Sequence, residues 1–170
     1  HQYPLYPGSG ALMETGEGSG RGYTVNVPLI SGHGDAEYAR VMEELFVPVG
    51  RLYRPDLVLV SCGFDCMAGD PVGSMRVTAA GIACLTRRMV ELAGAVCKGR
   101  LLLVLEGGYN LDNMRTGTLA ALSELRGRPL AADHPLLLPP GEDVRLAAAA
   151  VPSDGIDQAI AWARNWWTLP

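Results

Sequence analysis

Hydrophobic residues along the chain follow two different periodicities, which predict strands and helices in turn. The stretch Tyr23–Leu29 is short and rich in β-branched residues, and it predicts a strand. Two uninterrupted apolar runs, Leu57–Cys62 and Leu101–Leu105, are typical of strands buried on both faces of a parallel sheet. Residues 1–22 are rich in glycine, proline and serine, and they predict an extended surface loop.

Two segments between these strands carry apolar residues at the i, i+3, i+4 and i+7 spacing of an amphipathic helix. Asp35 is placed to cap the first helix, and Pro48 should kink or end it. Thr78 is placed to cap the second helix. The apolar stripes consist of Tyr38, Val41, Met42, Leu45, Phe46 and Val49 in the first helix, and of Ile82, Leu85, Met89 and Leu92 in the second.

A third amphipathic segment follows the last apolar run, and a fourth closes the chain. Asn110 should cap the third helix, which ends just before a glycine. The apolar residues of this helix are Leu111, Met114, Leu119, Leu122 and Leu125. The fourth helix should start at Ser153 or Asp154 and end near Trp167, after an irregular, Pro- and Ala-rich stretch over Arg128–Pro152. The order of elements predicts one α/β domain with a parallel sheet and right-handed crossovers.

Two loops follow the buried strands at the place where parallel sheets form functional sites, outside the carboxyl ends of the strands. The first loop contains Asp65 and the second contains Tyr109, so we expect both side chains at one edge of the sheet. Each residue also has a simpler interpretation. Asp65 could be a loop carboxylate that accepts backbone N–H groups, and Tyr109 could be a half-buried ring with its hydroxyl in water.

Composition and charge narrow the classes of partner. The chain has 170 residues and a formal net charge of −4, which gives no electrostatic reason to expect nucleic-acid binding. Its apolar runs are too short to cross a membrane. The chain begins with His1 rather than methionine and has no signal-peptide pattern, so we expect further sequence upstream.

The cysteine pattern fits neither a disulfide framework nor a paired zinc knuckle. The four cysteines are Cys62, Cys66, Cys84 and Cys97. Cys62 and Cys66 could share a metal, but reduced and partly buried thiols are the expected state. A cytoplasmic protein is the default expectation from this cysteine usage.

Glycines and histidines offer weaker signals. The glycines within residues 16–22 precede a strand, whereas a dinucleotide-binding motif follows a strand, so we reject that motif. Gly107 and Gly108 precede a helix and could bind phosphate, which keeps a flavodoxin-like nucleotide-binding domain as a minor alternative. The histidines are expected on the surface, and neither a metal-ligand spacing nor a Ser-His or Cys-His dyad is evident in the sequence. They are His1, His33 and His134.

An ordered set of short motifs is more specific than any single one. The motifs are residues 1–10, Tyr23–Leu29, Gly34–Tyr38, Pro55–Ser61, Gly63–Asp65, Gly69–Pro71 and Leu105–Asn110. With these motifs the sequence resembles the zinc-dependent histone deacetylase, acetylpolyamine amidohydrolase and acetoin-utilisation superfamily, closest to its class II-like bacterial branch. The resemblance covers about residues 1–130, leaving 131–170 as an irregular wrap and a final helix.

The resemblance implies an arginase-like or deacetylase-like three-layer α/β fold with a central parallel sheet, present here as its C-terminal portion. It also implies hydrolysis of an acetylated amine, either a lysine side chain or a polyamine, with zinc as the cofactor. Asp65 matches a zinc ligand, Tyr109 the catalytic tyrosine, and Tyr23 a position whose backbone carbonyl helps to bind potassium. The residues that match the substrate tunnel are Tyr6, Gly107 and Gly108.

The family's Asp-x-His zinc ligands and its histidine pair precede the segment that matches His1. We therefore expect that the chain needs the N-terminal part of the same domain before it can hold zinc tightly or hydrolyse an amide. The partial sheet should expose apolar edges and faces. A non-catalytic remnant or interaction module of the same fold is the alternative.

Overall fold

The computed structural model describes residues 1–128 and 153–170. The irregular segment expected over Arg128–Pro152 therefore lies almost wholly outside the described residues. In chain order the elements are a 3₁₀ turn at Gly18–Gly20, α1 (Asp35–Val41), a π-helical turn at Met42–Phe46, α2 (Val47–Tyr53), β1 (Val58–Cys62), α3 (Ala79–Cys97), β2 (Leu101–Leu105), α4 (Leu111–Leu125) and α6 (Asp154–Ala163).

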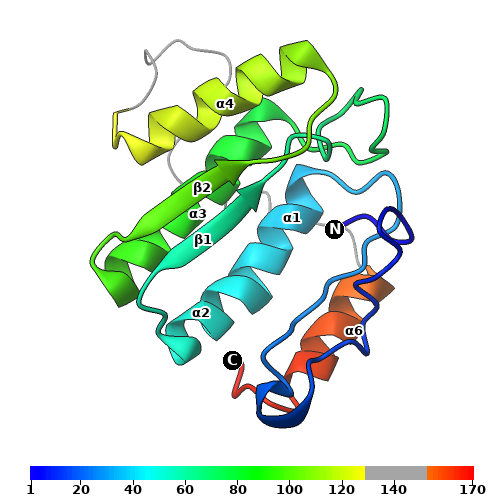
Figure 1. Cartoon of the computed structure of the whole chain (residues 1–170), viewed down its shortest axis with the longest axis vertical. Helices are drawn as coiled ribbons and strands as arrows, with labels where there is room; N and C mark the ends of the chain where they lie inside the picture. The colour runs from blue at the N-terminus through cyan, green and yellow to red at the C-terminus, as the bar shows by residue number, and fades with distance from the viewer. Residues whose placement is uncertain (129–152) are drawn as a thin grey trace.

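β1 and β2 are hydrogen-bonded parallel neighbours, as the two apolar runs predict (Figure 1). Their register pairs Val58 with Leu101 and Cys62 with Leu105. The two strands therefore end at the same level, and the loops that follow them leave the sheet from one edge. This geometry is what places the candidate site.

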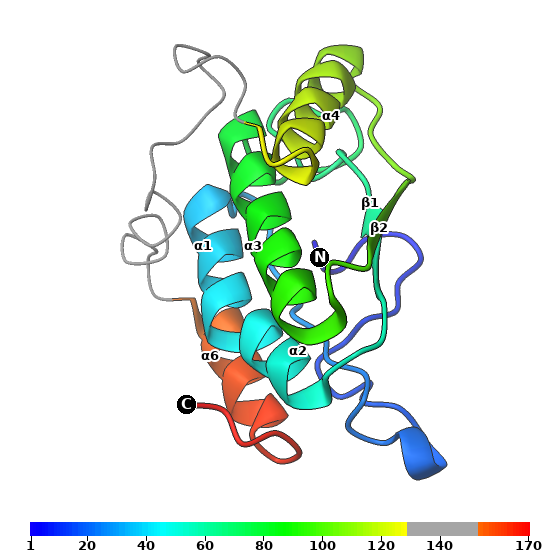
Figure 2. The same cartoon turned by 90° about the vertical axis from the view of Figure 1, so that its left-hand side faces the viewer.

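The expectation that these strands are buried on both faces is wrong for this chain. In the described residues, helices pack on one face of the sheet, and α3 lies directly against it (Figure 2). Leu59 and Leu102 point away from the helices and are 63% and 53% exposed. The exposed apolar face agrees with the second expectation from the sequence, namely that a partial sheet leaves apolar surface uncovered.

The first predicted helix is continuous from α1 to α2, and its N-terminus differs from the prediction. Gly34 is the N-cap, and its backbone N–H donates to Glu37 Oε2 at 2.8 Å. The Asp35 carboxylate instead accepts hydrogen bonds from the N–H and the hydroxyl of Thr78, at 2.7 and 2.6 Å. Asp35 thus ties the start of α1 to the start of α3.

Pro48 does not end the helix, because it lies in the first turn of α2. The backbone takes a π-helical turn over Met42–Phe46 and resumes at Val47 as α2, one residue before the proline. Because proline has no N–H to donate, a widened turn at this point absorbs the missing bond of the α-helical ladder.

The predicted strand Tyr23–Leu29 is also wrong. The segment is extended, but its one β-bridge in the described residues pairs Leu29 with Gln2. Val27 and Leu29 are buried against α1, the π-helical turn and α6. Their burial among helices, without a neighbouring strand, explains why the β-branched pattern is present and the sheet pairing is not.

The remaining predicted helices are confirmed. Thr78 caps α3 through a 3.2 Å bond from Gly81 N, and the Asn110 side chain caps α4. α6 starts at Asp154 behind the N-cap Ser153, and it ends at Ala163, before a turn that reaches Trp166.

Helix α4 buries small residues against α3 rather than its leucines. The buried residues of α4 are Gly117, Ala120, Ala121 and Ser123, whereas Leu111, Leu119, Leu122 and Leu125 are exposed. A two-pronged ion pair, with Arg87 Nη2 and Nε at 3.0 and 3.1 Å from the Glu124 carboxylate, joins the two helices. Leu122 and Leu125 line a small cavity with Leu103 and Leu105 on the helix-facing side of the sheet, so they do not belong to its open face.

Candidate active site

The loops after β1 and β2 lie side by side, as their order in the chain predicts. The ladder continues past the strands through two bonds, from Glu106 N to Cys62 O at 3.3 Å and from Phe64 N to Gly107 O at 2.9 Å. Asp65 and Gly107 therefore sit next to each other at the carboxyl edge of the sheet. Residues 63–78 are called the β1 loop below, and residues 106–110 the β2 loop.

Gly107 and Gly108 allow the two loops to approach closely. A Cβ atom on Gly107 would lie 2.4 Å from Asp65 Oδ2, which is closer than real side chains come. Gly108 has a φ of +127°, and a Cβ there would lie 3.0 Å from the Phe64 side chain. The glycine pair is therefore explained by contact with Asp65 and Phe64.

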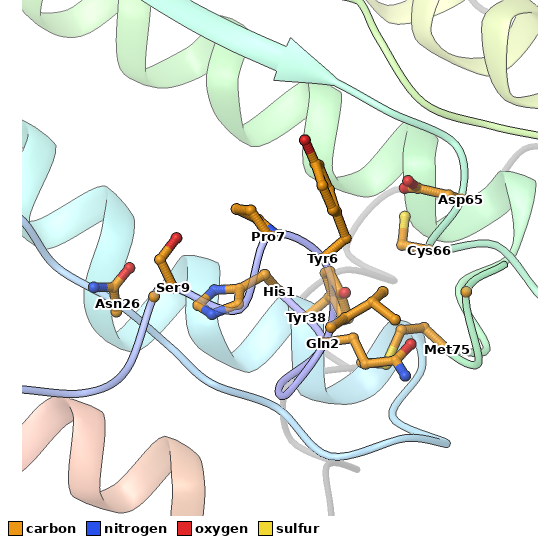
Figure 3. Close-up of a pocket in the computed structure, with 13 residues that line it drawn as sticks. His1, Gln2, Tyr6, Pro7, Ser9, Asn26, Tyr38, Asp65, Cys66 and Met75 are labelled. Carbon is orange, nitrogen blue, oxygen red and sulfur yellow. The ribbon is translucent and has the colours of Figure 1, made fainter. Parts of the chain in front are cut away.

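Asp65 lines a pocket of about 350 Å³ together with residues from the N-terminal segment and α1 (Figure 3). Figure 3 shows Asp65 and Cys66 from the β1 loop beside Tyr6, whose ring is 94% exposed. No hydrogen bond from the described residues reaches the Asp65 carboxylate. The simpler interpretation is a carboxylate that accepts hydrogen bonds from backbone N–H groups. It therefore does not describe Asp65 within this part of the chain.

That interpretation describes Asp70, a residue of the motif Gly69–Pro71 for which the sequence pattern predicts no role. The Asp70 side chain accepts four backbone hydrogen bonds, from Val72, Gly73, Tyr109 and Asn110. Burial pushes the pKa of Asp70 up, but the four N–H donors outweigh it and hold this pKa below its usual value. The motif Gly69–Pro71 was the signal from which this residue could have been found.

Tyr38 and Cys66 complete the inner wall of the pocket. Burial, and then the nearby Asp65 carboxylate, raise the pKa of the Cys66 thiol to about 12. Burial likewise raises the pKa of Tyr38. Both groups are therefore neutral at physiological pH, and Cys66 is a free thiol, as expected from the cysteine spacing. From the sequence, Tyr38 is expected in a helical stripe and in the motif Gly34–Tyr38, with no role at a site.

Tyr109 follows Gly108 and precedes the N-cap of α4, and its side chain is 59% exposed. It does not line the pocket that contains Asp65 and Tyr6. Tyr23 lies elsewhere, with its ring centroid 5.8 Å from that of Tyr53 and 5.7 Å from that of Trp167. The structure thus brings together Asp65, Tyr6 and Gly107, places Tyr109 on the adjoining loop, and leaves Tyr23 apart.

His33 is half-buried rather than a surface histidine. Its Nδ1 lies 2.8 Å from the Ile30 carbonyl and its Nε2 lies 3.1 Å from Ser153 Oγ. The ring therefore links the segment before α1 to the start of α6. His1 is exposed, and His134 lies outside the described residues.

Asp65 is a suitable single ligand for a metal, because its carboxylate is open to a pocket and zinc accepts carboxylate oxygen. Over residues 1–128 and 153–170, no group of three or more His, Cys, Asp or Glu side chains is arranged to hold a metal ion. A zinc site that uses Asp65 needs ligands from outside these ranges.

Within residues 1–128 and 153–170, no helix has both the length and the apolar character that a membrane crossing requires.

A parallel sheet with a carboxylate, two glycines and a tyrosine on adjoining carboxyl-end loops defines an α/β protein with a candidate ligand site at that edge. Comparison with known proteins identifies the family. The histone deacetylase domain model matches residues 1–125, so the chain belongs to the histone deacetylase domain family.

Sequence relatives and solved structures agree with this assignment. A probable deacetylase of Archaeoglobus fulgidus is 43% identical over 133 residues, covering 78% of this chain and 37% of the relative. Histone deacetylase 14, chloroplastic, of Arabidopsis thaliana is 38% identical over 141 residues, covering 81% and 33%. The crystal structure of the HDA15 HD domain superimposes with a TM-score of 0.79 at 31% identity, covering 98% of this chain and 42% of that one.

The structural match confirms the fold class expected from the sequence, a deacetylase-like α/β fold present in part. The chain spans about a third of the length of these two relatives. The described residues supply the sheet and the helices on one of its faces, so two of the three layers of the expected fold are represented.

Proposed function

We propose that the chain is the C-terminal part of a zinc-dependent deacetylase domain that hydrolyses the amide of acetyl-lysine or of an acetylated polyamine-like amine. One observation carries the proposal: the Asp65 carboxylate is open to a pocket, in contact range of Gly107 on the loop that bears Tyr109. Family membership supports the deacetylase class, and the choice between lysine and polyamine substrates is part of the proposal.

Each residue has a role that follows from its position. Asp65 offers one carboxylate oxygen to zinc, and the bound metal supplies polarisation of the acetyl carbonyl and activation of water. Gly107 packs against the Asp65 carboxylate and restricts where that carboxylate can rotate. The Tyr109 hydroxyl donates a hydrogen bond to the oxyanion that develops on the acetyl oxygen. Tyr6 contributes an aromatic wall for the alkyl chain of the substrate.

The rest of the domain is the partner that this proposal requires. The apolar side chains of Leu59, Leu102 and Val104 are exposed on the open face of the sheet and form an apolar surface that is unfavourable in water. The relatives contain about twice as much further sequence, which is enough to cover it. We propose that the N-terminal part of the domain packs on this surface and brings the remaining zinc ligands to Asp65.

The test uses the complete, zinc-loaded domain that contains this chain. We expect hydrolysis of an acetyl-lysine peptide or of an acetylated polyamine, and a loss of about 10²–10³ in kcat for Tyr109→Phe, because one oxyanion donor is removed. Tyr53→Phe is the matched control, because Tyr53 is also exposed but packs against Tyr23 away from the pocket. Full activity of Tyr109→Phe, or no hydrolysis of either substrate, would overturn the proposal.

A non-catalytic remnant is the second candidate, and one observation favours it: among the described residues, no group of three or more His, Cys, Asp or Glu side chains could hold a metal ion. The sequence upstream in the same gene separates the two candidates. An Asp-x-His element and a histidine pair in that sequence support catalysis, and their absence supports the remnant.

A further inference from the structure

The Asp70 carboxylate bridges the two loops of the candidate site. Its Oδ1 accepts from two N–H groups of its own loop, at 2.9 and 3.1 Å. Its Oδ2 accepts from the backbone N–H of Tyr109 at 2.8 Å and from that of Asn110 at 3.2 Å. The side chain is 8% exposed, so these bonds are shielded from competing water.

The other side-chain hydrogen bonds between the β1 loop and the segment around Asn110 hold the start of α4 and not the tyrosine. Asn110 Nδ2 and Asn113 Nδ2 donate to two backbone carbonyls of the β1 loop, at 3.1 and 3.0 Å. Asp70 is the side chain that reaches the Tyr109 backbone among the described residues. Its removal therefore frees the Tyr109 peptide while the α4 contacts remain.

We propose that Asp70 is a positioning residue for Tyr109, fixing the peptide from which the phenol projects over the reacting amide. This inference rests on the proposed function, since it assigns to Tyr109 the role of oxyanion donor. The hydroxyl stands at the far end of a long ring, so a small rotation of the backbone is amplified there. Displacing a catalytic group by about 1 Å can cost on the order of 10²-fold in rate.

Asp70→Asn is the most informative substitution, because asparagine has nearly the same shape. It offers one acceptor oxygen and one NH₂ group, whereas all four partners of Asp70 are donors. The NH₂ group must therefore face one of the two donor pairs, and the bridge opens on that side.

In the complete, zinc-loaded domain, we expect Asp70→Asn to lower kcat by about 10- to 100-fold, with less than about a threefold change in KM. Asp112→Asn is the matched control. It removes a carboxylate from the first turn of α4, but Asp112 is exposed, and its ion-pair contact within the described residues, to Arg115, is 3.9 Å long. We expect the kcat of this control to stay at the wild-type value.

A double mutant separates positioning from a general loss of structure. If Asp70 acts through the Tyr109 hydroxyl, Asp70→Asn should lower kcat little further once Tyr109→Phe has removed that hydroxyl. A merely structural role predicts that the two losses multiply. Should Asp70→Asn fail to fold, Asp70→Glu keeps the charge, shifts the acceptors by one methylene, and serves in the same cycle.

Amide hydrogen exchange on the 170-residue chain gives a second readout that needs no activity. We expect the N–H groups of Tyr109 and Asn110 to exchange at least about tenfold faster in Asp70→Asn, while those in the middle of α4 keep their protection. Unchanged exchange, an unchanged kcat, or multiplying losses in the double mutant would overturn the positioning role. An inactive wild-type domain with faster exchange in Asp70→Asn would instead overturn the proposed function and leave Asp70 as a structural bridge.

Discussion

Replacing Gly107 with alanine tests the contact between the β2 loop and the Asp65 carboxylate. The added Cβ would lie 2.4 Å from Asp65 Oδ2 and 3.0 Å from Asp65 Cγ. Real Cβ contacts stay beyond 3.0 Å, so the two groups must separate by at least 0.6 Å. The φ of Gly107 lies outside the left-handed region, so the substitution adds a steric contact without backbone strain.

The carboxylate is the part of this contact that can move at low cost, because the backbones of the two loops are joined by the bond from Phe64 N to Gly107 O. We therefore expect Gly107→Ala to lower the free energy of unfolding by only about 1 kcal/mol, the low end for overpacking. Metal ligation tolerates much less displacement, about 0.2 Å. We expect zinc affinity of the complete domain to fall by about 10- to 100-fold, as for other changes that reorient a ligand.

Gly127→Ala is the control with the opposite pattern. Gly127 has a φ of +58° and no atom within 4 Å of its Cβ position. Alanine there should cost about 1–2 kcal/mol of stability through the left-handed backbone and leave zinc affinity unchanged. Zinc affinity is measured by competition with a chromophoric chelator, and stability by urea unfolding. Wild-type zinc affinity in Gly107→Ala would refute the assignment of Asp65 as a ligand held in place by this glycine.

Three further predictions concern the rest of the fold. Gly117→Ala should destabilise the chain by about 1–3 kcal/mol in urea unfolding, because its Cβ would lie 2.6 Å from Phe64 Cδ1, whereas Gly94→Ala, with open space in α3, should stabilise it by about 0.5–1 kcal/mol. The pKa of Asp70 is held low by its N–H donors despite burial, so its stabilisation should be complete above about pH 4 and be lost as the pH falls through the folded-state pKa; Asp70→Asn should flatten the acid limb of a stability-against-pH curve. The 170-residue chain alone should bind a hydrophobic dye more strongly than the complete domain, and Leu59→Lys should weaken that binding; equal dye binding by both would contradict an open sheet face.

The predictable part of the fold is the part decided by local sequence. β1 and β2 follow from continuous apolar runs, and α3 and α4 from caps whose side chains bond to the next turn. The failures concern partners that the local pattern does not contain. Val27 is as β-branched as a strand residue, yet helices rather than a neighbouring strand bury it. The apolar run around Leu59 predicts a core residue, yet the sheet face that carries Leu59 is uncovered within the described part of the chain.

The features of the candidate site also fall into those that local sequence predicts and those that depend on the folded loops. The order of strands and loops is enough to predict that Asp65 and Tyr109 leave the sheet from one edge, since parallel strands in register end together. The use of each carboxylate is not predictable in this way. Asp65 and Asp70 both follow β1 in a glycine-containing loop, and only the folded turn decides which one receives the backbone N–H groups.

The different use of the Asp65 and Asp70 carboxylates is the strongest physical argument for the site. A carboxylate that accepts four backbone N–H groups has its lone pairs engaged and little capacity left for a metal, so Asp70 cannot replace Asp65. Asp65, open to the pocket, can bind a cation but cannot fix the neighbouring loop. The proposed zinc chemistry needs both conditions at once: an available ligand, and the proposed oxyanion donor Tyr109 held still on the adjoining loop. One carboxylate meets each condition, and exchanging the two would lose both.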